Sequence, residues 1–231
     1  MHDAEQLEQT PFGTVNAYTN AFHAAQNDPL LNDVYAQAAA DHVSVVSPNV
    51  AHLLETLVTA RQPKRVLELG TAYGVSTLHM KRALASDATL VTVELVGERQ
   101  ERAREFLARE GALDDGLVFV QGDFREDGFF ESLHAQHGAF DFVFLDAAKG
   151  QYQHLLDRLT PMLAPGGMIV FDNIFLNGWI IADAYPNHRQ KTAFVRMKAF
   201  LEGIKTQKLY SNTLLSFDDG VLILSKKEEV L

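Results

Sequence analysis

The 231-residue chain is long enough for one α/β domain with a sizeable core, and its 47% hydrophobic and 22% charged residues are ordinary for a soluble globular protein. It has no cysteine, which excludes disulfides, thiolate zinc sites and a cysteine nucleophile and fits a cytoplasmic location. No apolar run approaches the roughly 20 residues that span a bilayer, and the acidic, polar start lacks the parts of a signal peptide.

The charge of the chain is strongly negative but unevenly distributed. With 20 basic and 30 acidic residues the formal net charge is −10, and such a surface on average repels phosphate backbones. Segment 186–208 is the exception, because its only acid is Glu202 and its local charge is about +5. Its basic residues are Arg189, Lys191, Arg196, Lys198, Lys205 and Lys208.

The predicted organisation is a single domain over residues 1–231, with helices in 1–60 and an α/β core in 61–231. No repeat or linker divides the chain, and the first ten residues are expected to fray. Asp28-Pro29 and Ser47-Pro48 each place a capping side chain before a proline, the pattern of a helix start.

From about residue 64, short β-rich runs alternate with helical stretches. This alternation predicts βαβ units, and therefore a Rossmann-like, doubly wound, mostly parallel sheet with helices on both faces. The predicted parallel strands are Arg65–Leu69, Leu90–Glu94, Leu117–Val120, Phe140–Leu145 and Met168–Phe171. Near the end, Asp218-Asp219-Gly220 separates Leu209–Phe217 from Val221–Ser225, which predicts an antiparallel pair at the sheet's end.

The first predicted strand runs into a glycine-containing turn, from Gly70 through Thr71 to Gly74, before a helix that starts near Val75. Glycines at a strand-to-helix turn let the backbone approach a ligand closely. A tight turn with no ligand would also explain them.

Acids follow the next two strands. Glu94 ends the second strand, where a carboxylate can accept hydrogen bonds from both ribose hydroxyls. Asp123 follows the third strand, where it can meet an adenine amino group. An exposed strand-end glutamate and a turn aspartate are the alternatives. The glycine turn, Glu94 and Asp123 lie at the carboxyl ends of three consecutive predicted strands, and together they favour an adenosine-containing ligand.

Two residues favour S-adenosylmethionine over NAD as that ligand. Ala72 stands where the dinucleotide fingerprint has its second glycine, so a pyrophosphate is less well accommodated. Glu68 lies just before the turn, and an acid suits a sulfonium or an amino group better than a pyrophosphate.

Asp146 follows the fourth strand, and Asp172 and Asn173 follow the fifth. These three hard oxygen donors suit Mg²⁺, Mn²⁺ or Ca²⁺, with the remaining positions left to water or substrate. Helix capping and a loop role are the alternatives, although acids grouped at strand ends are costly without a cation. Asp146 is also predicted to lie beside the cofactor.

Lys149 follows Asp146 by three residues and could act as a general base, or stay charged and position the substrate oxygen. A solvated surface lysine is the alternative. The predicted reaction starts with a substrate that chelates the metal through two vicinal oxygens. One of these, as an oxyanion, attacks the methyl group in line with the departing sulfur.

These residues resemble the metal-dependent class I O-methyltransferases, which include the catechol and caffeoyl-CoA O-methyltransferases. The resemblance runs from about residue 40 to the C-terminus and is carried by Val66–Gly70, by Asp146 with Lys149 and Tyr152, and by Asp172-Asn173. It implies metal ligation by Asp146, Asp172 and Asn173, a catalytic Lys149, and a homodimer. The implied cofactor contacts are Gly70, Ser76, Glu94 and Asp123.

Within the family, Phe144–Tyr152, Asp172–Gly178 and the basic stretch after Pro186 are most similar to bacterial tRNA 5-hydroxyuridine methyltransferases. That resemblance implies formation of 5-methoxyuridine in tRNA, whose precursor has vicinal oxygens as a catechol has. Segment 174–185, with Trp179, would then face the substrate, and its aromatic side chains would stack on a base or serve as core or dimer contacts. Arg189 and Lys191 are candidate RNA contacts.

Three functions follow from this pattern. The preferred one is methylation of tRNA, and the second is methylation of catechols or related diols, which the negative net charge favours. The third is a non-catalytic nucleotide-binding module, against which the complete metal triad and Lys149 argue.

Overall fold

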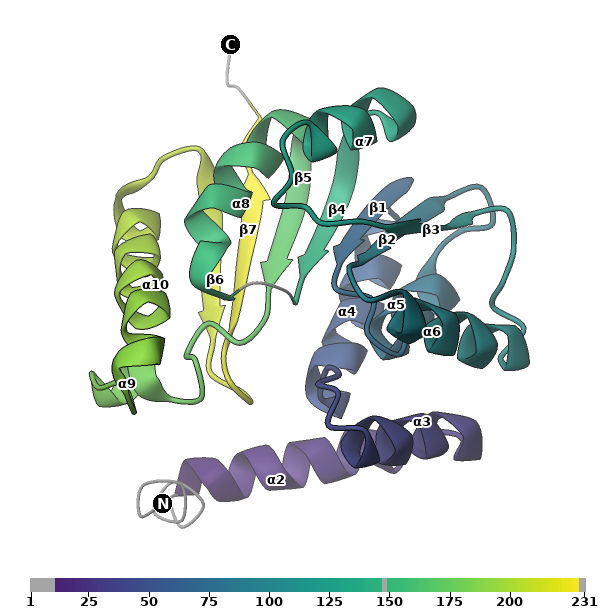
Figure 1. Ribbon diagram of the computed structural model, residues 1–231, viewed down its shortest axis with the longest axis horizontal. Coiled ribbons are helices and arrows are strands. Elements are labelled where there is room, and N and C mark those ends of the chain that lie inside the picture. Colours follow the sequence, from purple (N-terminus) through teal and green to yellow (C-terminus); the bar gives the residue numbers. More distant parts are fainter. Residues whose placement is uncertain (1–10, 147–148, 229–231) are drawn as a thin grey trace.

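The computed structural model describes residues 11–146 and 149–228 (Figure 1). Its centre is a seven-stranded sheet with strand order β3-β2-β1-β4-β5-β7-β6. The pairs among β1 to β5 are parallel, whereas β7 pairs antiparallel with both β5 and β6. The predicted α/β class, with a doubly wound sheet and an antiparallel C-terminal end, is confirmed.

The strand order reverses between β1 and β4, because the chain winds outward through β2 and β3 before it returns. In such sheets ligands bind outside the carboxyl ends of the strands at this switch point. The strands are β1 (Arg65–Leu69), β2 (Thr89–Glu94), β3 (Leu117–Gln121), β4 (Phe140–Leu145), β5 (Leu163–Phe171), β6 (Tyr210–Leu215) and β7 (Val221–Lys226).

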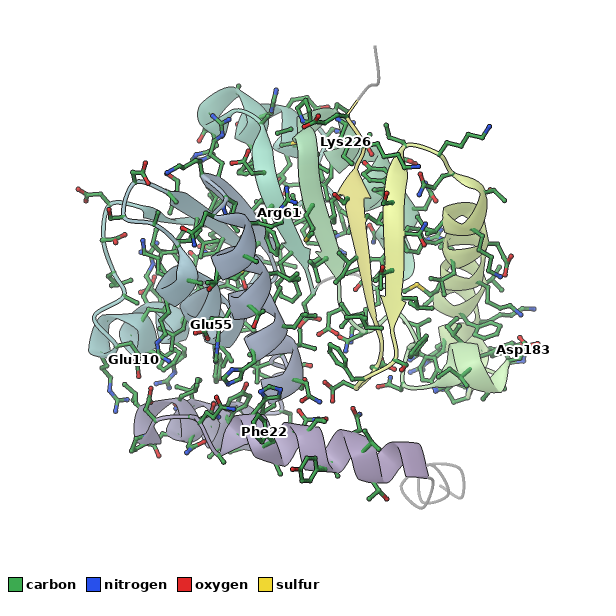
Figure 2. All side chains as sticks on the ribbon, turned by 180° about the vertical axis from the view of Figure 1, so that it is seen from behind. Phe22, Glu55, Arg61, Glu110, Asp183 and Lys226 are labelled. Atoms are coloured by element: carbon green, nitrogen blue, oxygen red, sulfur yellow. The ribbon has the colours of Figure 1, made fainter. Side chains whose placement is uncertain are left out.

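Helices cover both faces of the sheet. Helices α7, α8 and α10 cover the face that is nearer in Figure 1, α4 stands on the opposite face in Figure 2, and α2 and α3 cross one end of the sheet. The helices are α2 (Pro11–Ala24), α3 (Pro29–Ala40), α4 (Pro48–Arg61), α5 (Val75–Ala83), α6 (Gly97–Arg109), α7 (Phe129–His137), α8 (Tyr152–Leu159), α9 (Trp179–Ala182) and α10 (His188–Thr206). Within the described ranges, none of them is long and apolar enough to cross a membrane.

The two faces of the sheet bury two separate apolar cores. One joins alternate strand residues to α7, α8 and α10, with Phe171 and Phe200 in ring contact at 5.3 Å between centroids. The other joins the sheet to α3, α4, α5 and α6 and includes the fully buried Leu54 and Phe142. Burial on both faces explains why the parallel strands are continuous apolar runs.

Both predicted helix caps are present. Asp28 accepts a hydrogen bond from the Leu31 backbone N–H at 2.8 Å, and Ser47 accepts one from Val50 at 3.2 Å. Prolines at the first helical position lack the N–H that would have no partner there. The fraying expected for residues 1–10 lies outside the described residues.

The fifth strand begins earlier than predicted, at Leu163 rather than Met168. Leu163 pairs with Phe140 and Met168 pairs with Phe142, so a bulge separates the two. It contains a proline and Gly166, whose φ is 70°. The sequence run breaks at these residues, although the backbone pairing continues around them.

The hairpin between β6 and β7 ties the N-terminal helices to the sheet. Asp218 at its turn accepts hydrogen bonds from the Asn20 side-chain amide at 2.5 Å and the Ser47 hydroxyl at 2.6 Å. Its own backbone N–H donates to Asn16 at 2.9 Å. Helix α2 is therefore anchored through a carboxylate far away in the sequence.

Candidate active site at the strand ends

A cavity of about 510 Å³ opens at the carboxyl ends of β1 to β4. It brings together five residues that the sequence singles out, namely Gly70, Glu94, Asp123, Asp146 and Lys149. They come from four separate strand ends, as the switch point of a doubly wound sheet requires. The parallel register therefore assembles a polar pocket from residues that are distant in the chain.

The glycine turn is fixed by the end of β2. Ala72 has a φ of 45°, a left-handed conformation that is uncommon for a residue with a Cβ. Its backbone N–H donates to Glu94 Oε2 at 2.9 Å, and Glu94 Oε1 accepts from Val96 N–H at 3.0 Å. Such strain persists where surrounding contacts determine the backbone. Glu94 therefore holds the turn and also lines the cavity.

Thr71 and Gly70 sit against the second strand as well. Both backbone N–H groups donate to the Val93 carbonyl oxygen, at 3.2 and 2.9 Å. The Thr71 hydroxyl is buried and lies 2.6 Å from the Thr92 hydroxyl. The side chain of Thr71 is thus directed into the protein, and its backbone is the part that forms the turn.

Glu68 and Ser76 lie beneath the turn and are absent from the residues that line the cavity. Glu68 is fully buried and accepts hydrogen bonds from the hydroxyls of Ser76, Thr77 and Thr92. Burial raises the pKa of Glu68 to about 7. In this arrangement the carboxylate joins β1, β2 and the start of α5, and direct contact of Glu68 and Ser76 with a cofactor stays a prediction.

Asp123 lines the cavity together with Arg125. The two form an ion pair of 2.6 Å, and the hydrogen bond from the Arg125 side chain holds the Asp123 pKa below its usual value. Asp123 therefore stays ionised and able to accept from an amino group. Its contact with an adenine amino group stays a prediction.

Asp146 and Asp172 are adjacent because β4 and β5 pair in register. Leu145 lies opposite Phe171, so the residues that follow them meet at the sheet's edge. The backbone N–H of Asp172 donates to the Leu145 carbonyl oxygen at 3.0 Å. Asn173 has a φ of 55° and donates its backbone N–H to Asp172 Oδ1 at 2.7 Å.

The electrostatics of this pair point to a cation. Burial raises the Asp146 pKa to about 6. Burial, and then the charge of Asp146, raise the Asp172 pKa well above its usual value, and Asp172 is only 2% exposed. The Lys149 ammonium counteracts both shifts. A buried carboxylate next to a partly buried one is unfavourable unless positive charge binds there, so this donor set fits a divalent cation with oxygen ligands.

Tyr152 supports the site from below. It is 1% exposed, and its hydroxyl donates to the backbone carbonyl oxygen of Asp172 at 2.6 Å. Burial raises its pKa far above the ordinary value, with the carboxylates as a second cause, so it stays a neutral donor. Residues 147 and 148 of the Asp146–Tyr152 motif lie outside the described residues.

Sequence reasoning missed Asp219 and the residues that precede α4. Asp219 appeared only as a turn residue, yet it accepts from the backbone N–H groups of Asn177 and Gly178 at 2.8 and 3.1 Å. It thereby fixes the loop after Asn173. His42 and Ser44 line the cavity, although nothing in their local pattern predicted it.

The residues predicted to contact substrate do not line this cavity. Trp179 is partly buried and packs against the core beside α10, which agrees with the alternative that it is a core contact. Arg189 and Lys191 are exposed at the start of α10. Tyr185 lies against Phe194 with 5.5 Å between ring centroids. A role of Trp179, Arg189 or Lys191 in substrate binding stays a prediction.

The fold and the site define an α/β protein with a ligand pocket and a carboxylate pair at its topological switch point. A family model described as O-methyltransferase matches residues 22–227. The chain therefore belongs to the O-methyltransferase family, and the enzyme class predicted from the sequence is confirmed.

Individual relatives agree with this assignment. A catechol O-methyltransferase of Niastella koreensis is 30% identical over 171 residues, which are 74% of this chain and 76% of that protein. Caffeoyl-CoA O-methyltransferase 2 of maize is 28% identical over 189 residues, covering 79% of this chain and 66% of that protein.

Solved structures share the fold. The O-methyltransferase TomG of Streptomyces achromogenes, solved with S-adenosylmethionine, superposes with a TM-score of 0.80 at 24% identity, over 95% of this chain and 99% of that one. At this identity the likeness concerns the fold, and the predicted methyltransferase sheet is thereby confirmed.

Proposed function

We propose that this protein transfers the methyl group of S-adenosylmethionine to one oxygen of a vicinal pair, on a substrate held by a divalent cation. The observation that carries the proposal is that Asp146 lines the same cavity as Glu94 and has the buried carboxylate of Asp172 beside it. The proposed cation ligands therefore lie next to the proposed adenosine site, as methyl transfer to a chelated oxygen requires.

The cofactor half of this proposal uses the turn and the acids around it. The backbone at Gly70 leaves room for the cofactor to approach. The Glu94 carboxylate, which two backbone N–H groups already orient, accepts hydrogen bonds from the ribose hydroxyls. The Asp123 carboxylate accepts a hydrogen bond from the adenine amino group. The structure of TomG with S-adenosylmethionine on the same fold supports this choice of cofactor.

The metal half uses Asp146, Asp172 and Asn173 as ligands. Mg²⁺, or Mn²⁺ or Ca²⁺, would be held by these three residues and would supply a lowered pKa for a substrate hydroxyl. Tyr152 holds the backbone at Asp172, so the carboxylate is placed before a ligand arrives.

Lys149 completes the chemical half. It lines the same cavity as Asp146, at the start of a 3₁₀ turn that follows the strand end. From there its ammonium can orient the substrate oxygen, or its amine can take the hydroxyl proton before attack on the methyl group. The sulfur then leaves in line with the attacking oxygen.

We propose a small catechol-type molecule as the substrate. The relatives named for catechol and caffeoyl-CoA methylation support this choice, as does the net charge of −10. 5-Hydroxyuridine in tRNA is the second candidate, favoured by the exposed cations of α10. Two of those cations are already paired, because Lys198 contacts Asp183 and Lys205 contacts Glu202 at 2.6 Å.

A paired assay tests the substrate and the metal together. The protein is incubated with labelled S-adenosylmethionine and either a catechol or tRNA that carries 5-hydroxyuridine, with and without EDTA. We expect transfer to the catechol, loss of transfer with EDTA, and recovery with Mg²⁺. Activity that survives exhaustive chelation would refute the metal, and efficient transfer to tRNA alone would reverse the order of substrates.

Two further expectations complete the proposal. A non-catalytic nucleotide-binding module predicts S-adenosylmethionine binding without transfer to any diol, which the same assay detects.

A homodimer stays a prediction, and the exposed apolar residues Val15, Tyr18 and Phe22 on α2 give it a candidate surface. Light scattering of the purified protein measures its mass directly.

A further inference from the structure

A second polar cluster lies among the helices on the other face of the sheet, away from the strand-end cavity. It consists of His23 on α2, His52 and Glu55 on α4, and His79 on α5. Figure 2 shows α4, with Glu55 labelled, standing above α2, with Phe22 labelled next to His23 in the sequence. None of the four residues lines the strand-end cavity.

The rings of this cluster are in contact. His23 stacks on His52 with 4.6 Å between ring centroids, and His52 meets His79 edge to face at 5.0 Å. Ring atoms of His52 and His79 and a carboxylate oxygen of Glu55 lie within 4.8 Å of one another. Three imidazoles and a carboxylate therefore converge from three helices.

Each histidine has a buried ring nitrogen without a hydrogen-bond partner. The atoms are Nδ1 of His23, Nε2 of His52 and Nε2 of His79. Buried polar atoms are normally paired, so three unpaired nitrogens in one cluster require an explanation. Apolar side chains would pack such a space without that cost, which argues against a purely structural role.

The state of His79 suits metal binding. Its Nδ1 lies 2.7 Å from Glu55 Oε2, and since a carboxylate only accepts, Nδ1 is the donor. Burial lowers the pKa of His79, and burial followed by the neighbouring imidazoles lowers that of His52, so both are neutral at pH 7. A neutral ring that donates through Nδ1 keeps the lone pair of Nε2 free.

The cluster can be reached from solvent. A groove of about 680 Å³ between α2 and α4 is lined by His23 and His52. Glu55 has a side-chain exposure of 37%, whereas His79 is 2% exposed at the inner end. A cation can therefore enter from the side of α2 and meet the buried ring last.

We propose that His23, His52 and His79 bind a transition-metal cation of the Zn²⁺ type through their three unpaired ring nitrogens. Glu55 positions His79 by accepting the hydrogen bond from its Nδ1, as carboxylates commonly do for metal-bound imidazoles. Imidazole nitrogen is a donor that Zn²⁺ accepts, whereas Mg²⁺ prefers oxygen. Tetrahedral zinc keeps nitrogen ligands about 3.4 Å apart, a spacing that side-chain rotation would reach from ring centroids 4.6 and 5.0 Å apart.

The cation would join α2 to α4 and α5 and so stabilise the N-terminal helices. It is separate from the methyl-transfer chemistry, and the two sites differ in preferred metal. A site that binds only in the folded state raises the melting temperature with cation concentration, by about 5 °C or more at a hundredfold excess over Kd.

The test uses the full, untagged chain with millimolar Mg²⁺ present to occupy the oxygen site. Zn²⁺ is titrated, bound zinc is measured after gel filtration, and melting is followed in parallel. The variants are His52→Gln and Glu55→Gln, which change partly exposed side chains and are expected to fold. The matched control is the double variant His134→Gln/His137→Gln, which removes an exposed and a partly buried histidine on α7.

We expect one zinc per chain in the wild-type protein and the control, and at least a tenfold weaker affinity in both test variants. The Asp172→Asn variant should still bind zinc, which separates this site from the strand-end site. Co²⁺ in place of Zn²⁺ should give the intense visible absorption of a tetrahedral complex. Absence of zinc from the wild-type protein, or unchanged binding in His52→Gln and Glu55→Gln, would overturn the proposal.

Discussion

The protein has two partly buried polar clusters, and the chain assembles them in different ways. Asp146 and Asp172 follow strands that pair in register, with Leu145 opposite Phe171. His52 and His79 lie on different helices and meet only because α4 packs against α5. The first cluster is positioned by backbone hydrogen bonds, and the second by side-chain packing.

This difference has a physical consequence. The strand-end cluster consists of oxygen donors on a rigid edge, where the main cost is removing charge from water and repulsion between the carboxylates adds to it. The helix-layer cluster consists of neutral nitrogens, where the cost is missing hydrogen bonds. The first should therefore respond to hard cations and to pH, and the second to zinc-type cations.

The β6–β7 hairpin connects the two regions. Asp218 accepts hydrogen bonds from Asn20 and Ser47 in the N-terminal helices, whereas Asp219 accepts from the loop after Asn173. Adjacent residues of one turn thus contact the helix layer and the strand-end site. Substitutions that change only one of the two regions test whether the regions act independently.

The largest effect is expected for Asp172→Asn, which breaks the strand-end cluster. The amide keeps the shape but removes a charge that a divalent cation needs. We expect kcat/KM for catechol methylation to fall at least about 100-fold, equivalent to about 2.7 kcal/mol of barrier. Steady-state kinetics over a range of Mg²⁺ concentrations measure this.

The control is Asp115→Asn, which changes an exposed carboxylate in the loop before β3. It should leave kcat/KM within twofold. A similar loss in both variants would mean that general charge, rather than the cation site, controls the reaction.

The contrast also explains what the sequence could predict. The strands, the switch point and Asp146, Asp172 and Asn173 follow from apolar runs that end in polar residues, a pattern local to each strand. The histidine cluster has no such local pattern, because His23, His52 and His79 are related only through helix packing. The bulge in β5 was missed for a similar reason, since Phe140 pairs with Leu163 across it.

The next largest effect is expected for Asp218→Ala, which separates the N-terminal helices from the hairpin. It removes a carboxylate that accepts from Asn20 at 2.5 Å and Ser47 at 2.6 Å. A net contribution of about 0.5–1.5 kcal/mol from each of these two partly buried hydrogen bonds predicts that the free energy of unfolding falls by about 1–3 kcal/mol. Urea denaturation followed by circular dichroism measures it.

Asp218→Asn is the matched comparison, because an asparagine keeps one acceptor oxygen and tolerates the observed φ of 52°. Its loss of stability should be smaller than that of the alanine variant. If Asp218→Ala were as stable as the wild-type protein, the anchor described here would have no energetic role.

The stability of the metal-free protein should depend on pH through the strand-end carboxylates. The folded-state pKa of Asp146 is about 6, above its unfolded value of 3.8. Between these values the folded state binds more protons, so this group's contribution favours folding at low pH and is lost as the pH rises through about 6. Removing the charge should therefore stabilise the metal-free protein near pH 7.5.

We expect metal-free Asp146→Asn to unfold at a higher temperature than the wild-type protein at pH 7.5, by a few degrees, and the difference to shrink at pH 4.5. Mg²⁺ should raise the melting temperature of the wild-type protein more than that of the variant. Thermal melts at the two pH values, with EDTA or Mg²⁺, measure both effects. A variant less stable than the wild-type protein under metal-free conditions at pH 7.5 would contradict the predicted cost of the Asp146 charge.

The smallest effect is expected for Arg189→Glu/Lys191→Glu with a catechol as substrate. Both side chains are exposed at the start of α10, and neither lines the strand-end cavity. Exposed charges are screened over about 8 Å at physiological salt, so kcat/KM for a catechol should stay within twofold. Transfer to tRNA, where it occurs, should fall at least tenfold and lose part of its salt dependence. A tenfold loss with the catechol itself would instead mean that the start of α10 closes over the site, and the strand-end cluster would then not act alone.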